Sequence, residues 1–240
     1  MQNILCVICV KPNTIWLEFL SKFTHYEIFV IVDDNSMNYK DMYSQYTNIK
    51  IIQINNDTCM NANYSRSTHI TIHKDITGWD KMIYYFSNVY TDYSKLWILE
   101  DDVFIYNENT LLNIDAKYTD SDLLSRFYYE NPLGENNDWH WNKITIQTPP
   151  PYYCAMVCCI RVSKDLMLKI KDYISEYKTT FFVEALFSTI CKTSQLKYDK
   201  PEEFDNVVWR QDFKTEEINR VNIYHPIKDI YRHAELRNIL

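Results

Sequence analysis

Three consecutive carboxylates follow an apolar run near the middle of the chain. The run Leu96 to Leu99 has the length and the unbroken apolarity of a strand buried on both faces of a mostly parallel sheet, and Glu100, Asp101 and Asp102 come directly after it. Ligands in such sheets bind outside the carboxyl ends of the strands, so we expect the three acids at the ligand edge. Adjacent carboxylates stay ionised only if something compensates their charge, and their hard oxygens suit Mg²⁺ or Mn²⁺. The alternative is a solvated acidic turn at a strand end.

A second strand of the same kind occurs earlier in the chain. The apolar run Glu27 to Val32 ends in Asp33 and Asp34. Further strands are expected at residues 4–10 and 49–54, with helices at 15–20 and 39–46, a polar stretch at 55–67 and a helix after it. The order strand, helix, strand, helix, strand predicts the front of a doubly wound α/β sheet.

The pair of acid-tipped strands resembles the donor half of the GT-A glycosyltransferases. The resemblance implies an α/β fold of the GT-A, Rossmann-like type, with a mixed, mostly parallel sheet flanked by helices, in a single domain of residues 1–240. It implies that residues 1–106 bind the nucleotide-sugar and the metal. Residues 107–240 then form the acceptor half and a C-terminal tail that closes the metal site. The resemblance gives Asp33 or Asp34 the contact with the nucleoside.

The metal ligands follow from the same resemblance. The Glu-Asp-Asp form is closest to the N-acetylglucosaminyltransferase I type, whose last Asp binds the metal directly, and this implies Asp102 as a ligand of Mn²⁺ or Mg²⁺ with Asp101 beside it. Many GT-A enzymes bring a C-terminal His back to the metal. The sequence His225-Pro226-Ile227-Lys228 is similar to that element, which implies His225 as a second ligand and Lys228 as a contact of the diphosphate.

Three polar residues before the acidic triplet have two interpretations each. Thr77 and Asp80 have the spacing of a helix-capping pair. The resemblance instead implies that Asp80 and Lys81 face the sugar and phosphate of the donor. It also implies that Arg66, in the polar stretch upstream, contacts the base or a phosphate, and a solvated loop arginine is the alternative.

One carboxylate lies within the apolar stretch Phe181 to Phe187. A buried carboxylate is costly unless it is paired, protonated or used, and burial raises its affinity for a proton. In inverting GT-A enzymes an Asp or Glu from this late region takes the proton from the acceptor hydroxyl, so Glu184 is the candidate general base. The alternative is an exposed glutamate on a helix face.

The stretch of residues 131–151 is rich in proline and aromatic residues. We expect it to be irregular and largely exposed. Trp139 and Trp141 there are candidates for stacking on an acceptor sugar. The alternative is a tryptophan pair that packs the loop onto the core.

Composition excludes several classes of protein. With only two glycines among 240 residues, neither a dinucleotide-binding loop nor a Walker A loop is possible, so phosphates must be held by a metal and side chains. The net charge of -7 argues against nucleic-acid binding. No segment approaches the ~20 apolar residues of a membrane span. The richness in Tyr, Asn, Ile and Lys resembles the codon bias of an AT-rich genome, such as that of a large DNA virus.

The seven cysteines bear on the compartment. Several lie in apolar runs and are expected to be reduced core thiols. Cys6 and Cys9 have C-x-x-C spacing, but on a strand they point to opposite faces and make neither a zinc chelate nor a redox pair. These features predict a cytoplasmic protein, in the host cytoplasm if it is viral.

Together these features predict a metal-dependent glycosyltransferase. Its donor is a nucleotide-sugar, by analogy a UDP-sugar, and the sugar moves with inversion to a hydroxyl of a carbohydrate or glycosylated acceptor. A sugar-phosphate nucleotidyltransferase is one alternative, although such enzymes usually carry a glycine-rich loop near the N-terminus and Lys11-Pro12-Asn13 offers none. A non-catalytic nucleotide- or carbohydrate-binding module of the same fold is the other.

Overall fold

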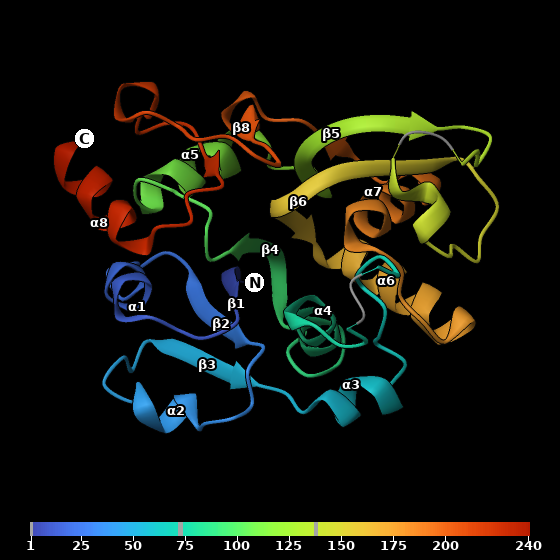
Figure 1. The fold of residues 1–240 in the computed structure, drawn as a ribbon, viewed down its shortest axis with the longest axis horizontal. Coiled ribbons are helices and arrows are strands. Elements are labelled where there is room, and N and C mark those ends of the chain that lie inside the picture. Colours follow the sequence, from blue (N-terminus) through green and yellow to red (C-terminus); the bar gives the residue numbers. More distant parts are fainter. Residues whose placement is uncertain (1, 72–73, 137–138) are drawn as a thin grey trace.

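A computed structural model describes residues 2–71, 74–136 and 139–240, and its centre is a seven-stranded sheet (Figure 1). Strands of the N-terminal half are all parallel and lie in the order β3-β2-β1-β4. Their bounds are β1 (Gln2–Cys9), β2 (Glu27–Val32), β3 (Ile49–Gln53) and β4 (Tyr93–Glu100). The carboxyl ends of these strands therefore meet at one edge, and the acids at the ends of β2 and β4 lie on either side of β1.

The C-terminal half of the sheet is of mixed direction. β6 pairs antiparallel with β4 on one side and with β5 on the other, and β7 pairs parallel with β5. Their bounds are β5 (Leu123–Asn131), β6 (Tyr152–Ser163) and β7 (Tyr198–Asp199). The predicted α/β class, with a mixed and mostly parallel sheet flanked by helices, is confirmed.

Helices cover both faces of the sheet. One face packs against α4 (Gly78–Asn88), α6 (Lys164–Tyr177) and α7 (Val183–Thr193), and the other against α1 (Thr14–Leu20) and α5 (Glu108–Lys117). Cys6 faces the first layer and Cys9 the second, as the strand geometry predicted. All seven cysteines are buried and unpaired, so the expectation of reduced core thiols is confirmed.

Shorter elements differ most from the sequence-based expectations. The helix expected at 39–46 is only α2 (Tyr39–Met42), and the polar stretch expected at 55–67 contains α3 (Asn56–Asn61). In the segment expected to be exposed, a 3₁₀ turn forms at His140–Lys143. Trp141 there is only 5% exposed and its Nε1 donates to the Tyr129 hydroxyl at 2.7 Å, so the expectation that this tryptophan is exposed is wrong.

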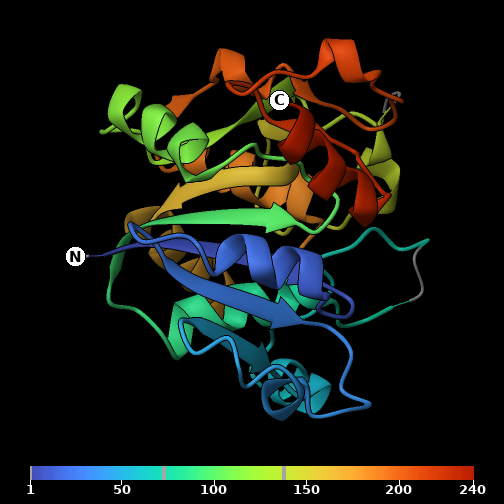
Figure 2. The same cartoon turned by 90° about the vertical axis from the view of Figure 1, so that its left-hand side faces the viewer.

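The C-terminal tail returns to the sheet edge beside β4. A two-stranded ladder forms from β8 (Asn206–Val207) and β9 (Tyr224–His225), and two further 3₁₀ turns lie at Glu202–Phe204 and Thr215–Glu217. The last helix, α8 (Ile230–Ile239), packs against α1, and the two lie next to each other at the side of the molecule shown in Figure 2. Among the described residues, no helix has the length and apolarity to cross a membrane.

Candidate metal centre and donor site

The turn after β4 carries the acidic triplet, and two of its three carboxylates face the same imidazole. Nε2 of His225 lies 3.2 Å from Oδ1 of Asp102 and 4.0 Å from Oε2 of Glu100. The other carboxylate oxygen of Glu100 accepts a hydrogen bond of 2.8 Å from Nε1 of Trp79, on α4. β4 ends at Glu100, and the tight turn that follows, closed by the amide of Val103 donating to the Glu100 carbonyl at 3.1 Å, presents both Glu100 and Asp102 to His225.

Backbone pairing brings His225 to this place. Phe104 and Tyr224 exchange two backbone hydrogen bonds, and the amide of Ile227 donates to the carbonyl of Asp102 at 2.8 Å. Chain segments on both sides of His225 are therefore fixed to the acidic turn. The predicted proximity of a C-terminal histidine to the acids is found in the structure.

The protonation of His225 follows from its other contact. Nδ1 lies 2.7 Å from the carbonyl oxygen of Val208, which can only accept, so Nδ1 carries the proton. In the neutral ring, Nε2 then presents a lone pair to the carboxylates. Burial alone would lower the pKa of His225, but Asp102, the Val208 carbonyl and Glu100 together raise it. The ring thus binds a cation at Nε2 readily, either a proton or a metal ion.

The donor atoms fit a divalent metal. Asp102 Oδ1 is buried, and among the residues that the structure describes its contact with Nε2 of His225 is a hydrogen bond only when that nitrogen is protonated. It faces the Nε2 lone pair, and two unshared lone pairs at this distance are favourable only with a cation between them. The two carboxylates supply the oxygens that suit Mn²⁺ or Mg²⁺, and the imidazole, whose other nitrogen is hydrogen-bonded to a carbonyl, adds a nitrogen ligand of the kind that transition-metal ions bind.

Asp101 takes a different position from its neighbours. Its carbonyl oxygen accepts a 2.7 Å hydrogen bond from Nε1 of Trp16, and no contact joins its carboxylate to His225 among the residues described. Burial and the charges of Asp102 and Glu100 raise the pKa of Asp101 to about 6. Glu100 was expected at the ligand edge without a role of its own, and its contact with His225 depends on the turn that follows β4.

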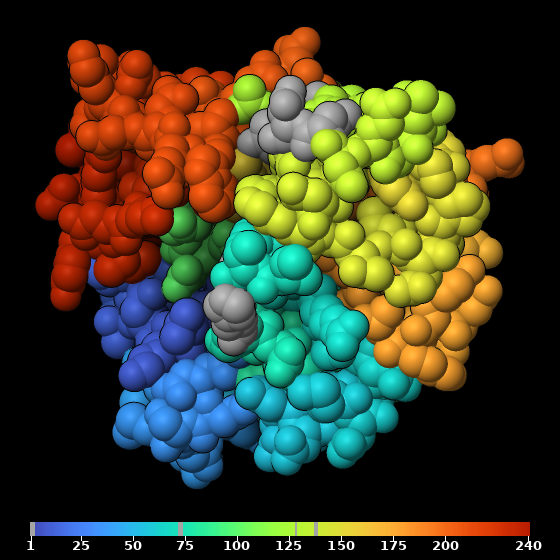
Figure 3. Space-filling model, turned by 45° about the vertical axis from the view of Figure 1, so that its right-hand side comes forward, coloured from blue at the N-terminus to red at the C-terminus, as the bar shows by residue number. Residues whose placement is uncertain are grey.

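A hollow lies in front of the acids. It has a volume of about 220 Å³ and is lined by the acidic triplet together with Asp33, Trp79 and Gly78. Gly78 is required for packing there, because a Cβ would lie 2.5 Å from a methyl carbon of Ile8. Figure 3 shows the green segment that follows β4 recessed between the blue N-terminal part and the orange-red C-terminal part of the chain.

A second hollow, of about 420 Å³, adjoins the first through Val10 and Asp33. The residues at the end of β2, from Asp33 to Ser36, line it together with Lys11, Asn56 and Lys74. The acids that follow β2 and the acids that follow β4 therefore border one continuous depression, with Asp33 between its two parts.

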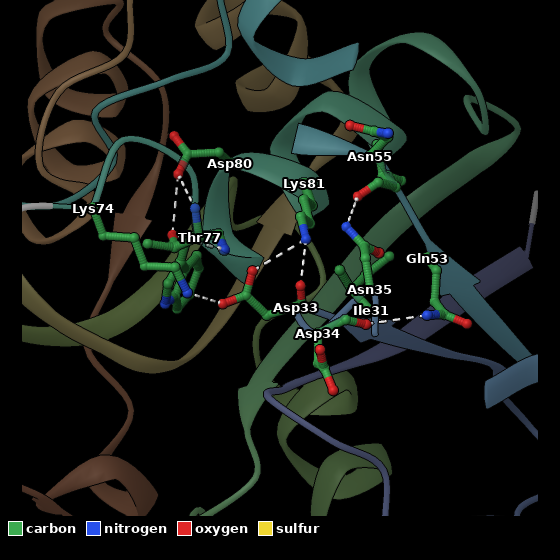
Figure 4. A network of polar contacts seen from close by, with 12 residues as sticks. Ile31, Asp33, Asp34, Asn35, Gln53, Asn55, Lys74, Thr77, Asp80 and Lys81 are labelled. Carbon is green, nitrogen blue, oxygen red and sulfur yellow. Dashed lines mark hydrogen bonds and ion pairs between the residues drawn. The ribbon is translucent and has the colours of Figure 1, made fainter. Parts of the chain in front are cut away.

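Asp33 is held by two lysines (Figure 4). Nζ of the fully buried Lys81 lies 3.2 Å from Asp33 Oδ1 and donates to the Asp33 carbonyl, and Lys74 pairs with the other carboxylate oxygen. Lys81 was expected to contact the donor directly, but in the structure it reaches the depression only through Asp33. Asp34 accepts hydrogen bonds from Ser36 and the Tyr39 hydroxyl, and these donors lower its pKa.

Asp80 has the capping role rather than the donor role. It is fully buried, and its oxygens accept hydrogen bonds from the amides of Ser67 and Thr77 and from both of their hydroxyls. Burial raises the pKa of Asp80 to about 6, although these hydrogen bonds oppose the shift. A buried carboxylate with both oxygens occupied does not contact a bound donor, so this expectation for Asp80 is not met.

Arg66 lies apart from the acids, whereas Lys228 lies next to them in the chain. Arg66 lines a third hollow of about 410 Å³, with Lys143 and Phe182 also in its lining and Lys74 shared with the Asp33 hollow. Lys228 is exposed and directly follows Ile227, the residue that hydrogen-bonds to Asp102. Its side chain is therefore attached next to the acidic turn.

Glu184 lies in the first turn of α7 and is only 9% exposed, so the alternative of an exposed helix-face glutamate is wrong. Burial raises its pKa to about 8, the charge of Glu100 adds to this, and His225 opposes it. No hydrogen bond from a described residue offsets the burial. The carboxylate is thus close enough to the acidic turn and His225 to be influenced by both, and its proton affinity suits proton transfer near neutral pH.

Comparison with known proteins supports the fold. The sequence matches no protein-family model and no curated protein. Among solved structures, galactosyltransferase LgtC in complex with donor and acceptor sugar analogues superposes with a TM-score of 0.52 at 14% identity, over 99% of this chain and 96% of LgtC. An active-site mutant of LgtC gives the same TM-score at 12% identity, with the same coverage. The chain therefore has the fold of this galactosyltransferase over nearly its whole length.

Proposed function

We propose that this protein is a metal-dependent glycosyltransferase. It moves a sugar from a nucleotide-sugar, by analogy a UDP-sugar, to a hydroxyl group of a carbohydrate or glycosylated acceptor. The observation that carries the proposal is the convergence of Glu100, Asp102 and His225 at the edge of a depression that extends to the acids after β2. The LgtC-like fold supports the same proposal.

The donor lies along this depression. The nucleoside occupies the hollow beside Asp33 and Asp34, and the diphosphate lies towards Glu100 and Asp102, where Lys228 can fold over it. These carboxylates would repel a diphosphate on their own. Mn²⁺ or Mg²⁺ held by Glu100, Asp102 and His225 would neutralise the diphosphate and make it a better leaving group.

Glu184 takes the proton of the acceptor. The acceptor oxygen forms a bond to the anomeric carbon while the bond from that carbon to the diphosphate oxygen breaks, and the hydroxyl proton passes to the Glu184 carboxylate. Attack from the face opposite the leaving group inverts the configuration. Because a dication near Glu100 and His225 favours the ionised form, metal binding lowers the pKa of Glu184 and prepares it to accept the proton.

The test is a thermal-shift and turnover experiment. Nucleoside diphosphates and nucleotide-sugars are added to the protein with and without Mn²⁺, and release of the diphosphate is then measured with candidate acceptors. Binding to the folded state raises its stability by about 2.7 kcal/mol at a hundredfold excess over Kd. We expect UDP and a UDP-sugar to stabilise the protein only with the metal. Equal shifts without metal contradict the proposal, and binding without any transfer or hydrolysis supports a non-catalytic module.

A further inference from the structure

A thiol lies beside the proposed metal centre. Leu99 on β4 pairs with Cys159 on the antiparallel strand β6, so the next residues along the two strands are Glu100 and Cys158. One ligand atom each from Cys158, Glu100 and His225 lies within 4.8 Å of the other two. Among the residues that the structure describes, no other group of three His, Cys, Asp or Glu ligand atoms is this close together.

We propose that Cys158 is a further ligand of the metal centre and that it allows the centre to hold thiophilic divalent ions such as Zn²⁺, Cd²⁺ or Co²⁺. The centre then offers two overlapping donor sets around Nε2 of His225. Glu100 and Asp102 supply the oxygens that suit Mn²⁺ and Mg²⁺, and Cys158 with Glu100 supplies a sulfur and an oxygen for softer ions. This inference rests on the proposed metal centre.

The geometry requires only small movements. Metal-ligand bonds of about 2.0–2.3 Å place the donor atoms of a tetrahedral site about 3.3–3.8 Å apart. The three atoms lie within 4.8 Å of one another, and two of them, Glu100 Oε2 and His225 Nε2, already lie 4.0 Å apart. Rotations of the Glu100 and Cys158 side chains by about 1 Å at their tips are sufficient to close the site around an ion.

The thiol already contacts a carboxylate of the cluster. Cys158 is 6% exposed, its Sγ lies 3.5 Å from Met156 Sδ, which is a weak interaction, and its side chain also hydrogen-bonds to Glu100. Metal binding breaks the S–H bond, releases the proton to water and forms a metal-sulfur bond. A softer ion therefore gains a thiolate ligand, whereas Mg²⁺ gains little from sulfur and stays with the oxygens.

The test is a Co²⁺ titration of the full chain followed by absorption. A thiolate ligand gives a sulfur-to-cobalt charge-transfer band in the near ultraviolet, while the weaker d-d bands in the visible range report bound Co²⁺ with or without sulfur. We expect the wild type to show both the charge-transfer band and the d-d bands. In Cys158→Ser we expect the d-d bands to remain and the charge-transfer band to be lost. Cys9→Ser is the matched control, because Cys9 also lines the acidic hollow but lies outside the cluster, and it should keep both.

Affinity gives a second readout. Loss of an outer-shell partner alone costs about ten- to a hundredfold in metal affinity, so loss of the direct ligand in Cys158→Ser should weaken Cd²⁺ binding by at least about tenfold and leave Mg²⁺ binding within about twofold. Cys158→Ala, which keeps the strand apolar, should behave alike if the serine variant folds poorly. Bound Co²⁺ without a charge-transfer band in the wild type, or a band that persists in Cys158→Ser, overturns the role of Cys158 and leaves the oxygen-based centre intact. No binding of Co²⁺, Mn²⁺ or Mg²⁺ to the wild type overturns both proposals.

Discussion

Nε2 of His225 lies 3.2 Å from Asp102 Oδ1, and the amide of Ile227 donates to the carbonyl of the same aspartate. These contacts hold the C-terminal tail against the turn that follows the central strand β4. We therefore expect binding of the proposed metal ion at Asp102 to be coupled to docking of the tail, which α8 supports by packing on α1.

We expect His225→Ala to weaken binding of Mn²⁺ with UDP by at least about tenfold while leaving the fold intact, because it removes a direct ligand of the proposed centre and loss of an outer-shell partner alone costs about ten- to a hundredfold. Isothermal titration at several pH values checks this. In the wild type the affinity should fall as the pH falls through the raised pKa of His225, since a proton then occupies Nε2. In His225→Ala this part of the pH dependence should disappear. Wild-type affinity in the variant would remove His225 from the centre.

The acidic triplet allows a matched comparison. Glu100→Gln should reduce the Mn²⁺-dependent stabilisation by UDP strongly, because its carboxylate faces Nε2 of His225, whereas Asp101→Asn should reduce it little, because the Asp101 carboxylate makes no such contact among the described residues. The thermal shift that UDP causes in each variant, measured with and without Mn²⁺, shows which of the two carboxylates binds the ion. The reverse order would mean that Asp101 and not Glu100 binds the ion.

The sheet could be predicted from the sequence because its strands are long apolar runs. The run that ends at Val32 and the run before Glu100 are buried in the structure, and acids follow both at the same edge. The strand β5 and the helix α5 were not predicted, because their residues alternate less clearly between apolar and polar. The short helix α3 lies in a polar stretch whose hydrophobic pattern indicated no helix.

The candidate site was predictable in part. The sequence alone pointed to the acidic triplet, to the histidine of the C-terminal tail and to the glutamate in an apolar stretch. The structure brings Asp102, His225 and Glu184 close together. The choice between Glu100 and Asp101 depends on which carboxylate faces His225, which is a property of the turn. The contact of Asp80 with Thr77 follows from their capping spacing, but the burial of Asp80 also depends on Ser67 closing over it, which sequence spacing does not determine.

We expect Asp80→Asn to act on stability alone. The amide cannot accept all the hydrogen bonds that the carboxylate receives from Ser67 and Thr77, so at least one buried N–H donor loses its partner at a cost of about 1–3 kcal/mol. Urea denaturation measures the loss, and titration with Mn²⁺ and UDP at low temperature should give the wild-type Kd. Weaker nucleotide binding in a variant of unchanged stability would restore the donor role for Asp80.

Glu184→Gln should separate catalysis from binding. The amide cannot accept the acceptor proton, so transfer should fall by roughly 10²-fold or more while the Kd for the donor stays the same. The wild-type rate should rise with pH and level off below about 8, because the pKa of Glu184 is about 8 without metal and a bound dication lowers it, and the variant should lack this limb. Full transfer activity in the variant would reject the assignment, and a product of retained anomeric configuration would reject the single displacement.

Stability of the metal-free protein gives an independent check on Glu184. Its folded pKa of about 8 lies above the value of 4.5 for the unfolded chain, so the folded state binds more protons between these values. The resulting stabilisation is fully present below pH 4.5 and is lost as the pH rises towards 8. In Glu184→Gln this decline should be smaller, as measured by denaturation at about pH 6 and about pH 8. An unchanged decline would mean that Glu184 is ionised throughout.

The central claim is tested most directly by anomalous diffraction from crystals grown with Mn²⁺ and UDP. We predict one strong manganese peak bonded to His225 Nε2, Asp102 and Glu100, with the diphosphate on its open side and the nucleoside beside Asp33. A nucleotide bound in this depression without manganese, or a manganese peak remote from His225 and Asp102, would contradict the account.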